Sequence, residues 1–525
     1  MIDNQDSQEE SKTKNDISSS KETLDQRIPK YMDNNLLDPS FFEGISLDPE
    51  LMTEIQQGLL ITRVLKPIVR HCKPMGGFIF FTGKRWEQDD IRARSVFTSF
   101  GMEQYDQAKK RMDEHDKKVE RRKLEVAKAI RNRTFDEEKN ALALQEEKAE
   151  KAEAKAFLSM AKKMCTFAGI EHAMKDAIHR ILAQPEEFDA DPFLLNTPAG
   201  TIDLRTGESR PHNPADLITK MTAVSPSDIG MDKWRTFMSQ LTRDDKELEL
   251  FMQSIAGMCL MGRIDNEMMV LALGPGSSGK STYLNSQQMV LGDYSGLLSS
   301  EVMLLGGKKY RGPELATLKG ERLVLMYEFG SERRLDADAL KMLVSANDIH
   351  GDAKYCPPID FKPSHTIILH TNNYIRNLDN DTERRILVLP FRASFVGQGV
   401  ILNYGRVLFE DAGGAVLSWM LEGTRRYIAQ NFSLGQLPKC VAEENEAWVP
   451  KNEWLSEFIE TCCDCSPELF AKASDLFAAY QDYARSKGET AKSQNELSAG
   501  LLSLGYTKTR KSTGKIYMGL ELKSL

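Results

Sequence analysis

The sequence predicts an α/β protein whose centre is a doubly wound, parallel β-sheet. An apolar run over residues 268–273 leads into a glycine-rich loop and then into a helix start. Three further apolar runs, at residues 322–328, 366–372 and 386–390, alternate with helical segments, which is the pattern of parallel strands joined by crossover helices. Polar residues end two of these runs and precede the third, and open parallel sheets bind their ligands at the carboxyl ends of their strands. These three observations define the fold class.

Length and composition indicate a protein of several domains. The chain has 525 residues, enough for about three or four domains, and a formal net charge of −8. This charge excludes a uniformly basic protein, so any DNA contact must come from local patches. Eight cysteines in so long a chain indicate a reducing compartment. No apolar run reaches the ~18 residues of a membrane span, and the N-terminus lacks a signal pattern, so we expect a cytoplasmic protein without a membrane partner.

The first 232 residues predict a polar tail followed by a mainly helical domain. Residues 1–38 are rich in Ser, Lys, Glu, Asp and Asn, which predicts a disordered tail. Residues 39–232 form the N-terminal domain, with a strand at residues 78–81 and a β-hairpin or small β-unit at residues 193–207. Residues 103–156 are dominated by charged side chains. We predict one long, solvated helix there, because apolar residues are too sparse for a coiled coil and interleaved acids argue against a DNA-binding patch.

The glycine-rich loop fits the phosphate-binding pattern G-x-x-x-x-G-K-[ST]. It follows a helix predicted over residues 234–261 and a buried strand, and a second helix starts after it, which is the context that the motif requires. Backbone N–H groups of such a loop surround phosphate oxygens. Lys280 then reaches the β- and γ-phosphates, and the Ser281 hydroxyl is placed to ligate Mg²⁺. The predicted nucleotide-binding residues are Gly274, Pro275, Gly276, Ser277, Ser278, Gly279, Lys280, Ser281 and Thr282.

Polar residues flank the later apolar runs. Glu328 ends the second run, where a carboxylate is the expected partner of Mg²⁺ or of the attacking water. Asn372 ends the third run; its amide either hydrogen-bonds the water or γ-phosphate or simply forms a turn. Arg384 and Arg385 precede the fourth run, either as a surface charge pair or as the source of an arginine finger for a neighbouring subunit. Together these motifs predict a nucleotide hydrolase.

The C-terminal region predicts a unit that contacts DNA. Residues 396–447 are helical and connect the sheet to residues 448–525, where helices precede two short strands joined by a Ser-Thr-Gly turn. Such a hairpin is typical of the wing of a winged helix. Its cations, with no acid among them, favour contact with DNA phosphates over a merely solvated turn. They are Lys508, Arg510, Lys511 and Lys515.

Two clusters look like metal sites but lack the necessary partners. Cys462, Cys463 and Cys465 have neither a second pair nor a following His, so we interpret them as ordinary thiols rather than as a zinc site. Asp189 and Asp191 stand alone among turn residues, which is too little for the metal site of a primase. We therefore expect neither a zinc site nor a separate primase domain in this sequence.

An ordered set of segments resembles the ATPase core of superfamily 3 helicases: GPGSSGKST, ELATLKGERLVLMYE, LDADALKMLVSANDI, FKPSHTIILHTNN and ERRILVLPF. The nearer resemblance is to the poxvirus-type and phage or plasmid primase–helicase branch. Two upstream segments, GGFIFFTGKRWEQDD and PFLLNTPAGTIDLRTGE, are similar to its helicase-associated domain. The resemblance covers about residues 75–395. It implies an AAA+-like P-loop ATPase at residues 233–395, preceded by a mainly helical helicase-associated domain and followed by a winged-helix-like domain.

The resemblance also implies a role for each catalytic motif. Gly279, Lys280 and Ser281 match the Walker A positions for phosphate and Mg²⁺, Glu328 matches the Walker B acid, and Asn372 matches the sensor-1 residue. The residue before the Walker B acid is a tyrosine instead of a second acid. The metal would therefore be coordinated mainly by the Walker A serine, phosphate oxygens and water.

Other family elements act between subunits or on DNA. Arg384 and Arg385 match the arginine pair that supplies a trans-acting finger, and we favour Arg385. A pore hairpin that grips single-stranded DNA is implied near residues 350–362, with His350 and Lys354 as candidate contacts.

The implied function is an ATP- and Mg²⁺-dependent DNA helicase that moves along single-stranded or forked DNA as a ring, expected to be a hexamer. It would serve replication of a virus, phage or other mobile element, alongside a separate primase or polymerase. One alternative is another P-loop machine, such as a packaging motor or a nucleotide-gated switch. A second alternative is an initiator that binds origin DNA through the C-terminal hairpin and holds nucleotide as a structural ligand.

Overall fold

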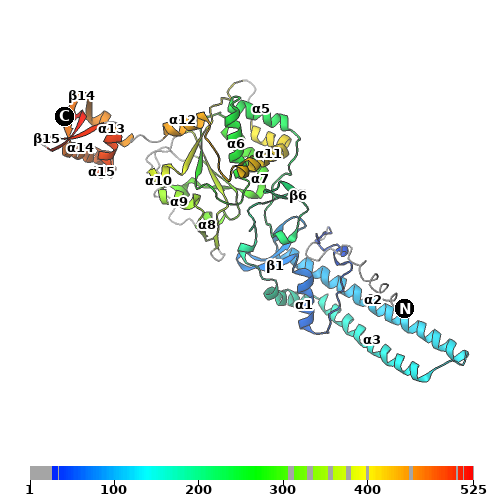
Figure 1. The fold of residues 1–525 in the computed structure, drawn as a ribbon. Helices are drawn as coiled ribbons and strands as arrows, with labels where there is room; N and C mark the ends of the chain where they lie inside the picture. The colour runs from blue at the N-terminus through cyan, green and yellow to red at the C-terminus, as the bar shows by residue number, and fades with distance from the viewer. Residues whose placement is uncertain are drawn as a thin grey trace, which may run out of the picture.

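The computed structural model describes residues 27–32, 35–304, 312–327, 335–352, 359–373, 380–397, 401–448, 453–503, 506–511 and 514–523. Glu328 and Lys354 lie outside these residues, as do the side chains of Arg510 and Lys511. The described part shows a central α/β body, a long helical arm on its N-terminal side and a small C-terminal unit (Figure 1). Within it, no helix combines the length and the apolar character needed to cross a membrane.

A five-stranded sheet forms the centre of the fold, and every neighbouring pair of its strands is parallel, as the sequence predicts. In spatial order the strands are β13 (Ile386–Pro390), β7 (Met269–Leu273), β12 (Thr366–Thr371), β9 (Leu323–Tyr327) and β8 (Ser295–Leu298). Four of them are the predicted apolar runs. The edge strand β8 is not predicted, because its Ser-Gly-Leu-Leu sequence is too short and too weakly apolar to indicate a strand.

Helices cover both faces of the sheet, so alternate residues of each strand enter different cores. Val270 and Ala272 of β7 pack on the side of α5 (Met231–Thr242), α6 (Lys246–Met258), α7 (Lys280–Leu291) and α11 (Tyr404–Ala429). Met269 and Leu271 pack on the opposite side, against α8 (Gly312–Ala316) and α9 (Ala337–Val344). Figure 1 shows these two layers flanking the sheet. Burial on both faces explains why the strands are continuous apolar runs.

The single helix predicted over residues 234–261 is wrong, because α5 ends before α6 begins. Arg243 and Asp244 have positive φ angles of 57° and 61°, so the backbone leaves the right-handed helical region. The Asp245 side chain then accepts a hydrogen bond from the Leu248 backbone N–H and starts α6. Both helices contribute to one core, which is why the apolar spacing continues across the break.

The N-terminal part is mainly helical and also contains two small antiparallel sheets. The predicted strand at residues 78–81 and the predicted β-unit at residues 193–207 are both present. The elements are α1 (Glu54–Leu65), β1 (Val69–Cys72), β2 (Gly77–Phe81), β3 (Trp86–Gln88), α4 (Phe167–Ala177), β4 (Leu194–Thr197), β5 (Gly200–Asp203) and β6 (Glu208–Arg210).

The predicted disordered tail is too long, because part of residues 27–38 packs onto the N-terminal domain. The Tyr31 hydroxyl donates to the Phe81 carbonyl at 2.5 Å. Leu37 is buried, and its N–H donates to Ser99 Oγ at 2.8 Å. A few apolar anchors thus order a segment whose average composition predicts disorder. Residues 1–26 lie outside the described residues.

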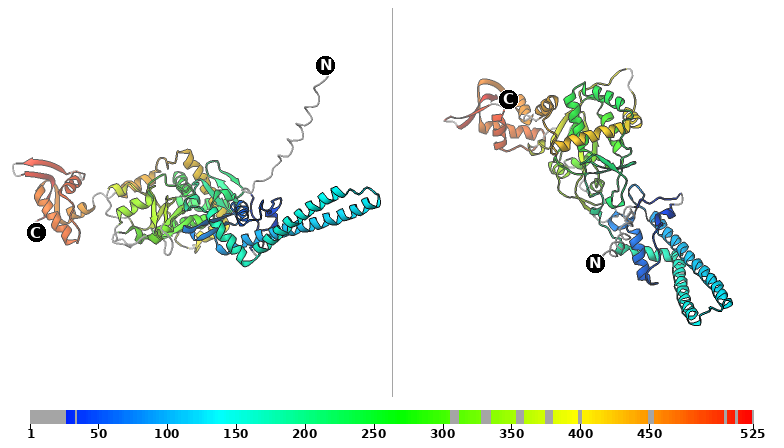
Figure 2. Two further views of the ribbon diagram at one scale, coloured as in Figure 1. Left: turned by 90° about the horizontal axis from the view of Figure 1, so that it is seen from below. Right: turned by 45° about the vertical axis from the view of Figure 1, so that its right-hand side comes forward.

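The single charged helix predicted over residues 103–156 is also wrong. Two helices, α2 (Asp90–Arg131) and α3 (Glu137–Met164), run side by side and form an arm that projects from the body (Figures 1 and 2). The chain reverses near Arg133, whose φ is 58°. Along α2 the less exposed residues recur four and three positions apart, which is the spacing of a coiled-coil seam. They are Ala108, Met112, His115, Val119, Arg122, Val126 and Ala129.

The seam of the arm is hidden in the sequence because it contains small and charged residues. Arg122 lies within it and forms an ion pair with Glu147 of α3 at 2.6 Å. Lys118 pairs with Glu150 across the helices, also at 2.6 Å. Ion pairs of the expected kind within one helix also exist, as between Glu120 and Lys123 of α2 at 3.7 Å. The pairs of Lys118 and Arg122 instead join the two helices.

The C-terminal unit begins after α12 (Lys439–Trp448), the last helix of the connector. Its helices are α13 (Glu453–Cys462), α14 (Ala473–Ser486) and α15 (Gln494–Ser503). Its antiparallel sheet has the order β14 (Cys463–Lys472), β16 (Gly514–Leu522) and β15 (Thr507–Lys511). The predicted basic hairpin is β15–β16. Strand β14 is not predicted, and a register shift between Cys465 and Phe470 interrupts its alternating pattern.

Candidate nucleotide-binding site

The glycine-rich loop joins the carboxyl end of β7 to the amino end of α7. Gly279, directly before α7, has a φ of 86°, and Ser277 has a φ of 60°. Left-handed residues of this kind let successive N–H groups turn toward one side of a loop and form an anion-binding nest. A Cβ on Gly276 would meet no atom within 4 Å, so the loop is open there. The local geometry therefore suits a phosphate group.

The chain that follows β13 forms the floor of this loop. A Cβ on Gly274 would lie 2.3 Å from the Phe391 carbonyl oxygen, and one on Gly279 would lie 2.8 Å from the Phe395 ring. The Phe395 N–H also donates to the Ser277 carbonyl at 2.8 Å. Glycine is thus required by close approach as well as by backbone conformation. Sequence reasoning missed both phenylalanines, because an aromatic residue after a strand has no distinctive pattern.

Lys280 is buried against the loop although it carries a charge. Its Nζ donates to the Gly274 carbonyl at 2.5 Å, the Pro275 carbonyl at 2.8 Å and Ser278 Oγ at 3.1 Å. A fourth contact, at 3.0 Å, reaches Asn372 Oδ1. These acceptors replace the hydration that an ammonium group loses on burial. The structure thereby brings together the predicted phosphate-binding lysine and the predicted strand-end amide.

The alignment of the strands explains this meeting. Thr371 of β12 lies opposite Leu273 of β7, so Asn372 and the loop begin side by side at one edge of the sheet. On the other side of β12, strand β9 ends at Tyr327. Glu328 follows Tyr327 in the chain and lies outside the described residues. The sheet therefore places the position after β12 between the loop and the end of β9.

Ser281 is the candidate protein ligand for a metal in the described part of the site. It lies in the first turn of α7 with an exposed side chain. Within the described ranges, no group of three or more His, Cys, Asp or Glu side chains is arranged to hold a metal. The donor set fits a Mg²⁺ ion shared with phosphates and water, which is how this ion usually binds.

The two candidate arginines lie at the opposite, amino edge of the sheet, immediately before β13. Arg385 Nη1 donates to Glu267 Oε2 at 2.6 Å, and this hydrogen bond lowers the pKa of Glu267. The Arg385 side chain is 19% exposed, and its Nε has no hydrogen-bond partner among the described residues. Arg384 is exposed. The Arg385 side chain is thus held within its own subunit, and which of the two arginines acts in trans stays a prediction.

An antiparallel hairpin stands where the sequence places a DNA-gripping element. Its strands are β10 (Ile349–Gly351) and β11 (Ile359–Phe361). His350 Nδ1 lies 2.7 Å from Asp360 Oδ1, and both side chains are exposed. Asp360 would compete with a DNA phosphate for the His350 imidazole, and DNA contact by His350 stays a prediction. Lys354, the other candidate on this hairpin, lies outside the described residues.

The basic residues of the C-terminal unit lie on the β15–β16 hairpin. Lys508 Nζ donates to Ser498 Oγ of α15 at 2.7 Å and lies 5.2 Å from the centre of the Tyr517 ring. Lys515 is exposed and is paired with Arg510 in the strand register. The hairpin is thus attached to α15 at one end and presents a lysine near its turn.

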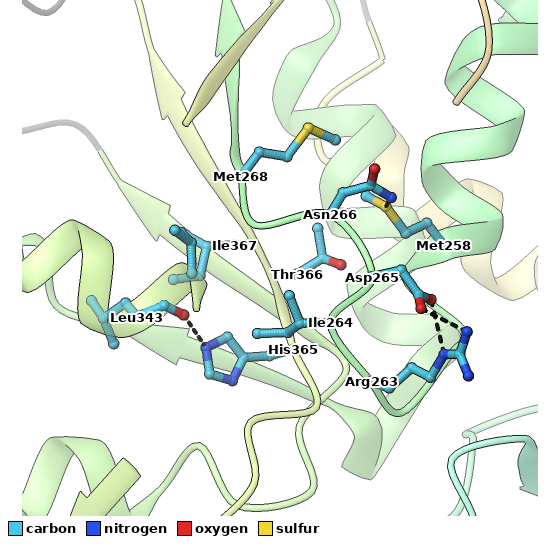
Figure 3. Close-up of a pocket in the computed structure, with 11 residues that line it drawn as sticks. Met258, Arg263, Ile264, Asp265, Asn266, Met268, Leu343, His365, Thr366 and Ile367 are labelled. Carbon is cyan, nitrogen blue, oxygen red and sulfur yellow. Dashed lines mark hydrogen bonds and ion pairs between the residues drawn. The ribbon is translucent and has the colours of Figure 1, made fainter. Parts of the chain in front are cut away.

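A small cavity lies at the amino side of the sheet, away from the loop (Figure 3). Its volume is about 10 Å³, which is the space of about one water molecule. His365 lines it, donating from Nε2 to the Leu343 carbonyl at 3.0 Å, while its Nδ1 is buried and has no hydrogen-bond partner in the described part. Burial lowers the pKa of His365 to about 4. This cavity is too small for a nucleotide, and its histidine is a neutral structural group.

We expect acid to destabilise the wild-type chain more than the His365→Asn variant. The folded pKa is about 4 and the ordinary value is 6.5. Between these two pH values the unfolded chain therefore binds more protons than the folded chain. The free energy of unfolding that this histidine contributes above pH 6.5 is lost as the pH falls toward 4, by up to about 3 kcal/mol. Thermal unfolding at pH 7.5 and pH 5.5 measures this loss. An equal fall in Tm for both proteins would contradict it, and His350→Asn, at an exposed histidine, serves as the matched control.

Two protein families match this chain in neighbouring segments. The family described as "D5 N terminal like" matches residues 58–243. A "Family of unknown function (DUF5906)" matches residues 272–385. The second match begins at the carboxyl end of β7 and spans β9, β12 and all five predicted catalytic positions.

Three viral proteins that are named as helicases are similar to this chain. "Putative helicase L207/L206" of Acanthamoeba polyphaga mimivirus is 27% identical over 219 residues, which is 40% of this chain and 22% of that protein. "Putative helicase 184R" of Invertebrate iridescent virus 6 is 28% identical over 232 residues, 40% of this chain and 23% of that protein. "Putative helicase V13" of Sputnik virophage is 28% identical over 228 residues, 39% of this chain and 28% of that protein. The chain thus spans less than a third of the length of each relative.

A comparison with solved structures finds the apo C-terminal region of NrS-1. The TM-score is 0.35 and the sequence identity is 11%. The alignment covers 57% of this chain and 76% of that chain.

Proposed function

We propose that this chain, which belongs to the D5-like primase–helicase family and corresponds to its helicase part, is an ATP-driven DNA helicase that moves along single-stranded DNA as a ring. It would act in the replication of a virus, phage or other mobile element. Residues 233–395 would form an AAA+-like motor and residues 39–232 its helicase-associated domain. Residues 396–447 would connect the motor to a winged-helix-like domain at residues 448–525.

The observation that carries this proposal is the 3.0 Å contact between Lys280 Nζ and Asn372 Oδ1. Hydrolysis of a γ-phosphate needs a cation on the phosphate and a polar group that orients the attacking water. These two groups meet at one edge of the sheet because β12 lies between β7 and β9. The strand order thus supports an ATPase of the AAA+ type over a fold that only binds nucleotide.

Each side chain of the site has a distinct proposed role. The nest around Gly276 would hold the β-phosphate, and Lys280 would neutralise charge on the γ-phosphate. Mg²⁺ would be held by Ser281, phosphate oxygens and Glu328, and when bound it supplies further neutralisation of the phosphate charge. Asn372 would orient the water that attacks the γ-phosphate, so that ATP and water yield ADP and phosphate.

The position of the arginines supports hydrolysis between subunits. Strand β13 has five residues and is about 16 Å long at about 3.3 Å per residue. Arg384 precedes this strand, whereas the glycine-rich loop lies at its far end. A nucleotide in the same subunit is therefore out of reach of Arg384, and a head-to-tail ring would bring this arginine to the neighbour's γ-phosphate. We propose a hexamer, with Arg384 as the acting residue.

Two elements would contact DNA. The β10–β11 hairpin would face the channel of the ring and grip a single strand, with Lys354 as its main cation. The order of elements in the C-terminal unit, from α13 through β14, α14 and α15 to β15 and β16, supports a winged helix. Its cations Lys508, Arg510, Lys511 and Lys515 would contact the duplex part of a fork. A separate primase or polymerase would use the unwound strand.

Phosphate release in the presence of different DNA forms tests this function. We expect single-stranded oligonucleotides to stimulate ATP hydrolysis by the purified chain, and duplex DNA of the same sequence to stimulate it much less. Stimulation by duplex alone would indicate a packaging-type motor. Nucleotide binding without turnover would indicate an initiator, and either of these results would reject the helicase.

A further inference from the structure

Among the described residues, strand β13 stands at the edge of the sheet and has β7 as its one neighbouring strand. The Arg385 carbonyl accepts from the Met269 N–H, and the Phe391 N–H donates to the Leu273 carbonyl. Odd-numbered residues of β13 therefore hydrogen-bond to β7, and even-numbered ones direct their backbone groups away from the sheet. Such outward groups need partners, because an open edge leaves N–H and C=O groups unsatisfied.

The side chain of Asn445 on α12 satisfies the central outward residue, Val388. Asn445 Oδ1 accepts from the Val388 N–H at 2.9 Å, and its Nδ2 donates to the Val388 carbonyl at 2.8 Å. Nδ2 also donates to the Val441 carbonyl within α12, at 2.8 Å. One amide group thus makes the two hydrogen bonds that a neighbouring strand would make. Helix α12 packs against β13.

A second contact fixes α12 just beyond the end of the strand. Arg392 Nη2 donates to Glu444 Oε2 at 2.8 Å. Val388 is completely buried, so the amide meets the strand away from competing water. The helix is therefore attached to the middle of β13 and to the segment that follows it.

The clamped strand joins two functional parts of the proposed motor. Arg384 stands before its amino end, and Phe391 and Phe395 form the floor of the glycine-rich loop beyond its carboxyl end. The carboxyl end has its own anchors in the loop, including the hydrogen bond from the Phe395 N–H to the Ser277 carbonyl. The amino end is held from the β7 side, by the Met269 N–H on the Arg385 carbonyl and by the Arg385–Glu267 ion pair. Asn445 holds the outward side of the strand, four residues after Arg384.

We propose that Asn445 is a positioning residue that holds β13 so that Arg384 reaches the nucleotide of the neighbouring subunit. This inference rests on the proposed function, because it concerns hydrolysis between subunits. Asn445 itself touches neither nucleotide nor the reacting atoms. Its effect is geometric, since a displacement of about 1 Å at a catalytic group can reduce a rate by about a hundredfold.

The test compares Asn445→Leu with Glu446→Leu, an exposed position on the same helix. Leucine keeps the size of the side chain and favours the helix, but makes neither hydrogen bond to Val388. We expect Asn445→Leu to lower kcat by about tenfold or more while the affinity for a non-hydrolysable ATP analogue changes by less than about twofold. Glu446→Leu should change neither quantity. Loss of kcat and affinity together, or no change in kcat, would overturn the inference.

Mixed assemblies give a readout that a loss of stability would not move. Asn445→Leu subunits should regain activity when mixed with Lys280→Ala subunits, which supply a well-placed arginine. Asn445→Leu subunits should not regain activity when mixed with Arg384→Ala subunits. In that mixture every remaining arginine comes from an Asn445→Leu subunit and is therefore misplaced. Recovery in both mixtures would overturn the inference. If Lys280→Ala and Arg384→Ala fail to complement each other, the proposed function fails instead.

Discussion

Replacing Lys280 with alanine is expected to abolish ATP hydrolysis and DNA unwinding. Its Nζ donates to the Gly274 and Pro275 carbonyls of the loop and to Asn372 Oδ1. Without this lysine, the charge on the γ-phosphate is not neutralised and the amide that orients the water loses its hydrogen-bond donor. We therefore expect kcat to fall by at least about a thousandfold. Phosphate release with saturating ATP and a single-stranded oligonucleotide measures this loss.

Binding of DNA by this variant separates catalysis from folding. The β10–β11 and β15–β16 hairpins, which we propose contact DNA, are separate from the glycine-rich loop. The affinity of the variant for single-stranded DNA should therefore stay within about threefold of the wild-type value, and its Tm should change only slightly. Lys233→Ala is a suitable control, because Lys233 is an exposed lysine that pairs with Asp411 at 2.5 Å, away from the loop. Retained unwinding by Lys280→Ala would reject the assignment of this site.

Replacing Arg384 with alanine is expected to have the second largest effect. A trans-acting arginine contributes about a thousandfold or more to the rate of such enzymes. The affinity for an ATP analogue should be nearly unchanged, because Arg384 lies at the edge of the sheet opposite the loop. Steady-state kinetics together with analogue binding measure both quantities.

Arg385→Ala is the matched control for that experiment. Arg385 pairs with Glu267 in its own subunit, so its loss should lower stability by about 1 kcal/mol or less while kcat falls far less than in Arg384→Ala. If Arg385→Ala removes activity and Arg384→Ala does not, the roles of the two arginines are reversed. If neither variant loses activity, neither residue acts on the γ-phosphate.

The phosphate-binding loop and the central strands were predictable because their signals are local. A loop motif occupies consecutive residues, and strands covered on both faces are continuous apolar runs. The position of Asn372 was predictable as well, because it directly follows an apolar run and the carboxyl ends of parallel strands share one edge of the sheet. The break between α5 and α6 was missed because Arg243 and Asp244 adopt left-handed backbone without a glycine to signal it.

The remaining features depend on pairs of residues that lie far apart in the sequence. The ion pair of Arg385 joins residues 118 positions apart, and Asn445 meets Val388 across 57 positions. Neither residue type is distinctive by itself. The seam of the arm was missed because charged residues such as Arg122 occupy it, and only the partner helix shows that they are satisfied there.

The central claim is that ATP is hydrolysed at a boundary between two subunits. It is tested most directly by mixing Lys280→Ala subunits with Arg384→Ala subunits, each of which should be inactive alone. In random assemblies, about a quarter of the boundaries would combine an intact loop with an intact arginine, so the mixture should hydrolyse ATP in the presence of single-stranded DNA. A mixture that stays as inactive as its two components, although the subunits co-assemble, would contradict the account.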